Sequence, residues 1–397
     1  MIADVFEPKT FLNQKGDSDY MQRITDNLLL STRLSAKLAM AGMLGLAAIG
    51  LAGAQEVDNQ TMIERTVLPS MAVPSGQEDP TQSTITLPEG QLAPSPLNIG
   101  PPGNSIHIFP SVTNREGLAM ANADNGPLLY HAGGKIMGPT VTIYTIFWIP
   151  SHLQTGQPTS LPSNYEAVEV NMLYGYIGKG LSAIATQYYQ KLGGVSYIQN
   201  KGGEASHYYI DTSPYPASAC TDSVTPGNCI TDAQMRVEVQ KIKNFAKASG
   251  GLGQIFMVFT APGEGSCFDS SDASCAYNNY CAYHSHYMNG STPIIYSNEP
   301  YGDPNYCQVS GAPSPNGDLA ADTAATAASH ELTEAVTDPL GNAWFTSQGN
   351  EIGDLCAYNY GTVNWDGGKA NQMWNGGFYL LQTEFSNHTG QCLNTGP

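Results

Sequence analysis

The sequence predicts a layered α/β (α+β) domain in which a mixed β-sheet is flanked by helices. Two nearly continuous apolar runs, at 141–150 and 254–260, are typical of strands buried on both faces of a sheet. Two long segments, at 232–248 and 318–336, have the pattern of helices. Strands and helices alternate, and a hairpin signal, Asn289-Gly290, precedes the last helix, so we expect helices packed on a sheet.

The other elements follow from local signals. Thr231 or Asp232 caps the helix at 232–248, and the apolar residues of this helix share one face. The helix at 318–336 ends at Thr337-Asp338-Pro339, because proline cannot continue a helix. The remaining predicted elements are a helical stretch at 164–191, broken near Gly178–Gly180, and a short strand at 195–198. The two strands of the hairpin are predicted at 282–287 and 293–296.

Composition excludes several classes of function. The 397 residues carry a net charge of −18, which argues against binding to nucleic acid or to an anionic membrane surface. Charged residues make up 13%, about half of the roughly 25% usual for soluble domains. The hydrophobic share of 41% supplies a core. Uncharged polar residues must therefore cover most of the surface, as suits a secreted protein.

The first 54 residues are predicted to be a signal or leader. An uncharged run at 38–51 follows Arg33 and Lys37, and Ala52-Gly53-Ala54 resembles a cleavage site. The run is shorter than the roughly 20 residues of a membrane span, and no other segment is a candidate. A buried helix or an uncleaved anchor is the alternative. We expect no stable membrane span after cleavage.

Residues 55–117 are predicted to be a Pro/Ser/Thr-rich spacer or pro-segment. Prolines recur among Ser, Thr, Gln and Gly as far as about residue 105. Such a stretch buries too little apolar area to offset the entropy lost on ordering, so we expect disorder. Residues 118–397 would then form one domain.

The eight cysteines all follow the proposed cleavage site, and their even number in an exported chain predicts up to four disulfides. No C-x-x-C pair occurs, which argues against a thiolate zinc knuckle. Eight cysteines allow 105 pairings. Proximity along the chain favours Cys220–Cys229, Cys267–Cys275, Cys281–Cys307 and Cys356–Cys392.

The helix at 318–336 carries the motif with the clearest chemistry, His330-Glu331-Leu332-Thr333-Glu334. Residues at i and i+4 share a helix face, so His330 and Glu334 can bind one ion. The zincin motif H-E-x-x-H uses this spacing, with its Glu activating a metal-bound water. Here Glu334 replaces the second histidine, and a carboxylate can also bind Zn²⁺. With two carboxylates the ion could instead be a harder one.

The sequence offers a third ligand about twenty residues further on, in 351–356. We favour Asp354 over Glu351. Glu331 and Glu334 lie in the last two helical turns, where the helix dipole disfavours anions by about 0.3–1 kcal/mol each. A cation would compensate for both. The alternative is a helix end with solvated acids and an ordinary histidine. His284 or His286, which alternate on the predicted hairpin, could approach this site, or both could be structural.

Several segments around this motif resemble the Exordium family, the phosphate-induced protein 1-like proteins of plant cell walls with bacterial and fungal relatives. The similar segments are Leu128–Gly134, Cys281–His284, Pro315–Asp318, Ser329–Glu334, Asp338–Phe345 and Glu351–Cys356. The resemblance spans about 128–395 in collinear order, and it implies a secreted, surface- or cell-wall-associated protein. The family's activity is poorly defined. The plant proteins typically have Asn in place of Asp338, so a plant-type growth role does not follow.

Two functions remain open on the sequence. In the first, the chain is a secreted zincin-like metallohydrolase acting on peptides, with His330, Glu334 and Asp354 as ligands of Zn²⁺ and Glu331 as the catalytic general base. In the second, it is a non-catalytic extracellular or cell-wall protein, whose cluster binds a structural ion or none. An open coordination position beside a cleft would favour the first function, and a closed, buried ion would favour the second.

Overall fold

The computed structural model describes residues 62–67, 97–101, 104–202 and 206–396. All of them belong to Asp58–Pro397, one of the two units into which the chain divides. The predicted leader, 1–54, lies outside the described residues, as does most of the predicted spacer. Within the described residues, no helix combines the length and the apolar character needed to cross a membrane.

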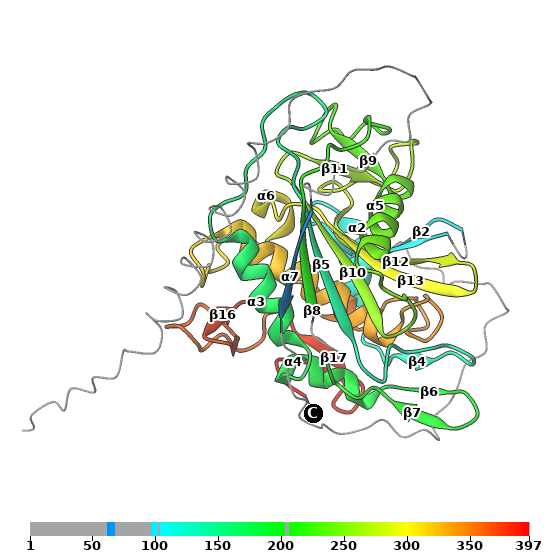
Figure 1. The fold of residues 1–397 in the computed structure, drawn as a ribbon. Helices are drawn as coiled ribbons and strands as arrows, with labels where there is room; N and C mark the ends of the chain where they lie inside the picture. The colour runs from blue at the N-terminus through cyan, green and yellow to red at the C-terminus, as the bar shows by residue number, and fades with distance from the viewer. Residues whose placement is uncertain (1–61, 68–96, 102–103, 203–205, 397) are drawn as a thin grey trace, which may run out of the picture. The chain divides into compact units, whose positions relative to one another are not determined.

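The central element is a mixed sheet of eight strands (Figure 1). Its inner strands β8, β5, β10 and β13 run parallel, while β1, β12, β3 and β2 pair antiparallel with their neighbours. The strands in spatial order are β1 (Met62–Val67), β8 (Ser206–Asp211), β5 (Thr142–Trp148), β10 (Gln254–Thr260), β13 (Thr292–Glu299), β12 (Tyr280–Asn289), β3 (Ile106–Pro110) and β2 (Asn98–Ile99).

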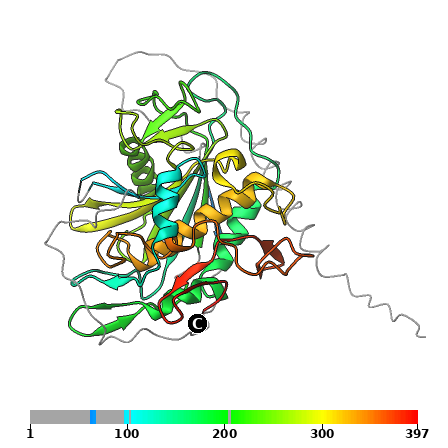
Figure 2. The ribbon, with the colours of Figure 1, turned by 180° about the vertical axis from the view of Figure 1, so that it is seen from behind.

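Helices cover both faces of this sheet. Helices α3 (Tyr165–Tyr176) and α7 (Leu319–Thr337) pack on one face, and α5 (Asp232–Phe245) packs on the other. Figure 1 shows α5 in front of the sheet, and Figure 2, the view from the opposite side, shows it behind the sheet. The predicted fold class, a mixed sheet flanked by helices, is confirmed.

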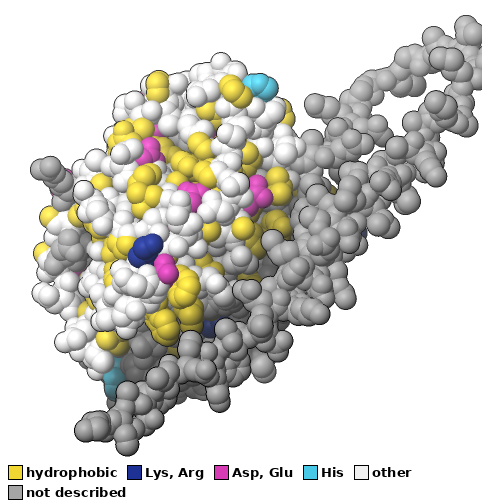
Figure 3. All heavy atoms as spheres, turned by 90° about the vertical axis from the view of Figure 1, so that its left-hand side faces the viewer, with side chains coloured by type: hydrophobic (Ala, Val, Ile, Leu, Met, Phe, Trp, Pro, Cys, Tyr) yellow, Lys and Arg dark blue, Asp and Glu magenta, His cyan; other side chains and the backbone are white. Residues whose placement is uncertain are grey.

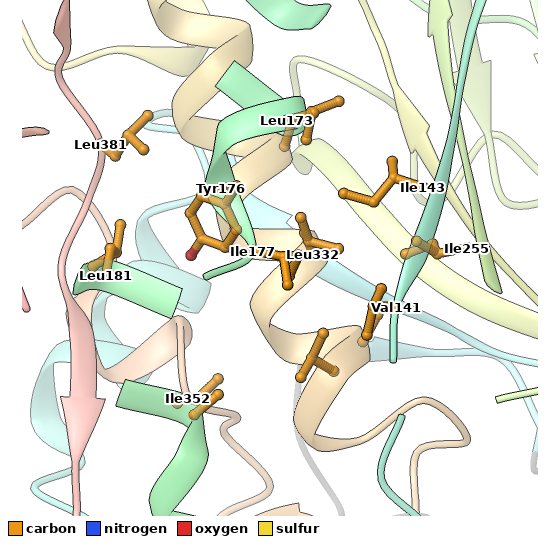
Figure 4. Close-up of a cluster of buried hydrophobic side chains, with 14 of the residues drawn as sticks. Val141, Ile143, Leu173, Tyr176, Ile177, Leu181, Ile255, Leu332, Ile352 and Leu381 are labelled. Carbon is orange, nitrogen blue, oxygen red and sulfur yellow. The ribbon is translucent and has the colours of Figure 1, made fainter. Parts of the chain in front are cut away.

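The core between α7 and the sheet positions helix α7, which carries the motif His330–Glu334. Leu332 on α7 is fully buried, and Figure 4 shows it among Ile143 and Ile255 of the sheet and Tyr176 and Ile177 at the end of α3. The alanine-rich sequence of α7 lets the helix lie close to its neighbours, and the helix is buried from Ala320 to Thr337. The helix is therefore surrounded by other parts of the chain along the turns that carry the motif.

Most predicted elements lie where the sequence places them. Helix α5 begins with a capping box in which Thr231 and Gln234 satisfy each other's backbone N–H groups, and α7 begins at the cap Asp318. The helical stretch predicted at 164–191 breaks at Gly178 as expected, but its end is a strand, β6 (Tyr189–Lys191). Here pairing with β7 (Val195–Tyr197) overrides the local helical pattern.

The predicted spacer contributes to the sheet. Strands β1, β2 and β3 all lie within 55–117, and β3 is an inner strand between β12 and β2. All five of its residues are buried. The signal for β3 is the short apolar run Ile106-His107-Ile108-Phe109, which follows directly on the proline-rich stretch.

Shorter elements surround the sheet. The helical ones are α2 (Arg115–Ala123), α4 (Gly180–Ala183), η2 (Ile184–Gln187), α6 (Pro304–Cys307) and η3 (Asp354–Cys356). The strands form two-stranded pairs: β4 (Leu129–Tyr130) with β14 (Trp344–Phe345), β9 (Cys229–Thr231) with β11 (Gly265–Cys267), β15 (Gln372–Trp374) with β16 (Gly377–Tyr379), and β17 (Glu384–Ser386) with β18 (Gln391–Leu393).

All eight cysteines are paired, and the four predicted pairings are confirmed: Cys220–Cys229, Cys267–Cys275, Cys281–Cys307 and Cys356–Cys392. On the face shown in Figure 3, charged side chains are few and scattered among uncharged polar and apolar atoms. Both features agree with the composition expected of an exported chain.

Candidate metal centre

Helix α7 presents the predicted motif to the interior. His330, Glu331 and Glu334 are each completely buried. His330 Nε2 lies 3.1 Å from Glu334 Oε1, as the i, i+4 spacing predicts. The helix ends at Thr337, and the carboxylate of Asp338 accepts hydrogen bonds from the N–H groups of Asn342 and Ala343 at 2.6 and 2.8 Å. The turn that follows the helix is thereby fixed.

Two adjacent strands of the sheet add histidines to this motif. His107 on β3 and His284 on β12 are direct partners in the antiparallel register, so their side chains lie on one face of the sheet. Their ring centroids are 5.6 Å apart. His284 Nδ1 lies 2.9 Å from Glu331 Oε2, which shows that this is the face on which α7 packs.

The segment 351–356 adds Glu351 and Asp354 to the buried cluster, which so far consists of His107, His284, His330, Glu331 and Glu334. The backbone N–H of Asp354 donates to Glu334 Oε1 at 3.1 Å, and Asp354 Oδ2 accepts from the backbone N–H of Glu351 at 2.7 Å. The disulfide Cys356–Cys392 anchors the end of this turn. Glu351 and Asp354, the two candidates for the third ligand, therefore both lie in the cluster.

The three residues predicted as metal ligands lie together. His330 Nε2 is 3.1 Å from Glu334 Oε1 and 3.8 Å from Asp354 Oδ1. His107, which was not predicted from the sequence, also faces both acids: its Nε2 lies 2.9 Å from Asp354 Oδ2, closer than His330, and 3.7 Å from Glu334 Oε2, farther than His330. That these residues are ligands stays a prediction.

Neighbouring side chains orient two of the histidine rings. His107 Nδ1 lies 2.8 Å from Asn98 Oδ1; when Nδ1 donates to this oxygen, the lone pair of the neutral ring is on Nε2. Metal-binding histidines usually have this arrangement. His330 Nδ1 lies 2.9 Å from the side-chain amide of Gln382. The orientation of that amide decides which nitrogen of His330 carries the proton.

Glu331, the predicted general base, is held by both of its oxygens. Oε1 accepts a hydrogen bond from the backbone N–H of Phe109 at 3.0 Å, and Oε2 faces His284 Nδ1 at 2.9 Å. A general base needs an oxygen within hydrogen-bonding reach of a substrate water. In this arrangement both oxygens of Glu331 tie α7 to β3 and β12.

The cluster concentrates acids that are almost completely buried. Burial raises the pKa values of Glu331, Glu334 and Glu351 well above the ordinary range, and neighbouring carboxyl groups raise each of them further. Without a cation, these groups favour the protonated form. A bound cation has the opposite effect, because it stabilises the carboxylates.

The histidines respond in different ways. Burial lowers the pKa of His330 to about 4, although the charge of Asp354 opposes the shift. Burial and the nearby His107 lower the pKa of His284 well below the usual value. Burial also acts on His107, but the charges of Asp354 and Glu334 outweigh it and raise its pKa. Rings that stay neutral near pH 7 are in the form that binds metal ions.

Several buried atoms in this cluster have no hydrogen-bond partner among the described residues. They are His330 Nε2, Glu334 Oε2, Glu351 Oε2 and Asp354 Oδ1. Buried polar atoms are rarely left in this state, because each costs roughly 1–3 kcal/mol. All four atoms are of the types that bind divalent ions, so the residues present fit a metal ion.

Three overlapping sets of residues have ligand atoms within 4.8 Å of one another, and all three contain Glu334. The sets are His107/Glu334/Asp354, His284/Glu334/Glu351 and His330/Glu331/Glu334. A mixture of imidazole and carboxylate ligands suits Zn²⁺ and other first-row divalent metals. A further set, Cys220/Cys229/Cys267, consists of disulfide-bonded cysteines and offers no thiolate.

A small cavity of about 20 Å³ reaches the cluster from the surface. Its lining includes His107, His284, His286 and the turn 339–341. A water needs roughly 10–15 Å³, so the cavity has room for about one water and not for a peptide. Of the two hairpin histidines, His284 is the one in the cluster, and His286 lies on the cavity wall.

His107 was not predicted as a site residue, because it falls within the predicted spacer. A histidine in a short β-type run, 106–109, was the available signal. Gln382 carries no sequence signal of its own, since only the fold brings it to His330.

Comparison with protein families identifies the region that carries most of this cluster. Residues 267–379 match the family model of the phosphate-induced protein 1 conserved region. The chain carries the conserved region of the Exordium, or phosphate-induced protein 1, family. This Exordium-like region contains His284, α7 and the turn 351–356, whereas His107 and Gln382 lie outside it. Comparisons with curated proteins and with solved structures found no match. The family and the four disulfides fit an extracellular protein.

Proposed function

We propose that this Exordium-like chain is a secreted protein whose buried His/Glu/Asp cluster binds a divalent cation, with Zn²⁺ as the best fit. Glu334 and Asp354 hold the ion together with a histidine nitrogen, from His107 or from the predicted ligand His330. The ion is structural, and the chain acts as a non-catalytic extracellular or cell-wall protein.

One observation carries the proposal. Glu334 Oε2 is buried without a hydrogen-bond partner among the described residues, and it lies 3.7 Å from both His107 Nε2 and His284 Nδ1. Two ligands of one tetrahedral ion, each bound at about 2.0–2.1 Å, are about 3.3 Å apart. The spacing is therefore close to that of atoms around an ion. Burial of the whole cluster and the small cavity support a closed centre.

The test is the metal content of the mature protein, purified without chelators and measured by elemental analysis. We expect at least one equivalent of zinc in the wild-type protein and none in Glu334→Ala, and a reduced content in His330→Ala. His131→Ala is the matched control, because His131 is also buried but stacks on Phe345 away from the cluster. A wild-type protein without metal would overturn the proposal.

A metallohydrolase acting on peptides is the second candidate, favoured by the His-Glu-x-x-Glu spacing and by the cavity that reaches His107 and His284. An ion in the cluster would polarise a substrate carbonyl. Glu331 would then have to release Phe109 or His284 to act as base. Peptidase activity that is lost in Glu331→Gln, with the metal content unchanged, would establish this function in place of the structural one.

A further inference from the structure

We propose that the cluster holds two divalent cations, bridged by Glu334 and Asp354. This inference rests on the proposed function, since it concerns how many ions the same cluster binds. It assigns one ion to the side of His330 and the other to the side of His107.

The geometry of the two acids points to a bridge. Each carboxylate turns one oxygen toward each of the two histidines. On the first side, His330 Nε2 is 3.1 Å from Glu334 Oε1 and 3.8 Å from Asp354 Oδ1. On the second side, His107 Nε2 is 3.7 Å from Glu334 Oε2 and 2.9 Å from Asp354 Oδ2. A single ion would leave one oxygen of each acid facing a histidine with no ion between them.

These separations fit ligands of two ions. Two atoms bound to one tetrahedral ion at about 2.0–2.1 Å are about 3.3 Å apart, and the four distances bracket that value. Two-metal sites hold their ions roughly 3.5–4 Å apart. Two carboxylates that each give one oxygen to each ion span that interval.

The charge of the cluster favours two ions over one. Four buried acids belong to the ligand sets: Glu331, Glu334, Glu351 and Asp354. When all four are ionised, one divalent cation leaves two negative charges buried and uncompensated, whereas two divalent cations balance the set. Uncompensated buried charge is among the most costly features of a fold.

Further ligands are available on the side of His107. His284 Nδ1 lies 3.7 Å from Glu334 Oε2, and Glu351 Oε2 is buried without a partner among the described residues. The side of His330 has a requirement of its own, because His330 must carry its proton on Nδ1 to bind through Nε2. In the structure Gln382 Nε2 lies 2.9 Å from His330 Nδ1 and donates to the backbone oxygen of Gly353 at 2.9 Å, so binding through His330 Nε2 requires the amide to turn and present its Oε1, which has no partner among the described residues, to the Nδ1 proton.

The first experiment is to count the ions. The full mature chain is stripped with a chelator, reloaded with Zn²⁺ alone, freed of excess metal and measured by elemental analysis. Two equivalents per chain are expected. One equivalent would overturn the two-ion inference and leave the proposed function intact, whereas none would overturn the proposed function.

The second experiment tests whether the two ions are neighbours. The stripped chain is reloaded with Mn²⁺, and its electron paramagnetic resonance spectrum is recorded. Two Mn²⁺ ions bridged by carboxylates give an exchange-coupled spectrum. Two equivalents with the spectrum of isolated ions would place the second ion elsewhere and overturn the inference.

Substitutions assign each ion to its side. His107→Gln and His330→Gln are each expected to lose about one of two equivalents, and Glu334→Gln to lose both. The buried His131→Gln is the matched control and keeps two. If His107→Gln and His330→Gln both retain two ions, the inference is wrong. Circular dichroism identifies any variant that fails to fold. If a variant is lost in this way, the number of zinc equivalents and the Mn²⁺ spectrum of the wild-type chain still test the two-ion inference.

Discussion

Removal of the proposed metal ion should lower the stability of the folded chain by a large and reversible amount. The proposed ligands come from separate parts of the chain, with His107 and Asp354 separated by 247 residues. An unfolded chain does not present such a set, so the ion binds the folded state alone. A strong chelator therefore removes a contribution that only the fold receives.

The size of the effect follows from mass action. A ligand present at 100 times its dissociation constant stabilises the folded state by about 2.7 kcal/mol, and at 1,000 times by about 4.1 kcal/mol. Unfolding entropy is about 2.1 cal/mol/K per residue, so for a domain the size of 118–397 a change of 1 kcal/mol shifts the melting temperature by about 1.7 °C. When the metal is present at 100 times its dissociation constant, we expect chelation to lower the melting temperature by roughly 5 °C.

Differential scanning calorimetry with and without chelator measures this shift, and re-addition of Zn²⁺ should restore the original value. Glu334→Gln is the control, because it removes the acid shared by all three ligand sets. This variant should melt lower than the wild type and show no response to chelator. A wild-type protein that gives up its metal to the chelator without any change in melting temperature would refute the reasoning.

Three other predictions follow from particular residues. A Cβ at Gly353 would lie 2.5 Å from His330 Nδ1, so Gly353→Ala should lose metal and melt lower, whereas Gly194→Ala, whose Cβ meets nothing within 4 Å, should do neither. Leu332→Ala should cost about 2–5 kcal/mol of unfolding free energy in denaturant titration, because the side chain is fully buried. Burial raises the pKa of Glu264 to about 8, so its stabilising effect is complete below about pH 4.5 and falls by about 1.4 kcal/mol per pH unit up to about pH 8. In Glu264→Gln, the measured pH dependence of stability should be flatter over that window, and an unchanged slope would contradict the assignment.

The sequence predicts the fold well where the local signals and the packing agree. The apolar runs at 141–150 and 254–260 became β5 and β10, and the Asn289-Gly290 signal marks the hairpin of β12 and β13. Where a long-range contact decides, the sequence is a weaker guide. The stretch at 189–191 reads as helix, but it pairs as a strand with β7. Strand β3 is too short to be recognised beside a proline-rich stretch, and its pairing with β12 defines it.

The candidate site divides in the same way. Its helical half could be predicted, because His330 and Glu334 are joined by helical periodicity alone. Asp354 could be proposed as an acid a short distance along the chain. His107 could not be placed, since only the register of β3 and β12 sets it opposite His284. The closed character of the site also depends on packing that no motif encodes.

The position of the acids on α7 favours the proposed cation over hydrogen bonds alone. Glu331 and Glu334 lie in the last two turns of the helix, where the dipole disfavours each by about 0.3–1 kcal/mol, and burial raises their pKa values. The N–H groups of Phe109 and Asp354 donate to these two acids, but such donors bring no net charge. Protonation would neutralise Glu334, yet an O–H on Oε2 would have no acceptor within hydrogen-bonding distance among the described residues. A cation at this oxygen would offset the negative charge and would also give the unpartnered Oε2 a ligand bond. The carboxylate of Glu334, which the helix dipole disfavours, is therefore at the centre of the proposed metal site.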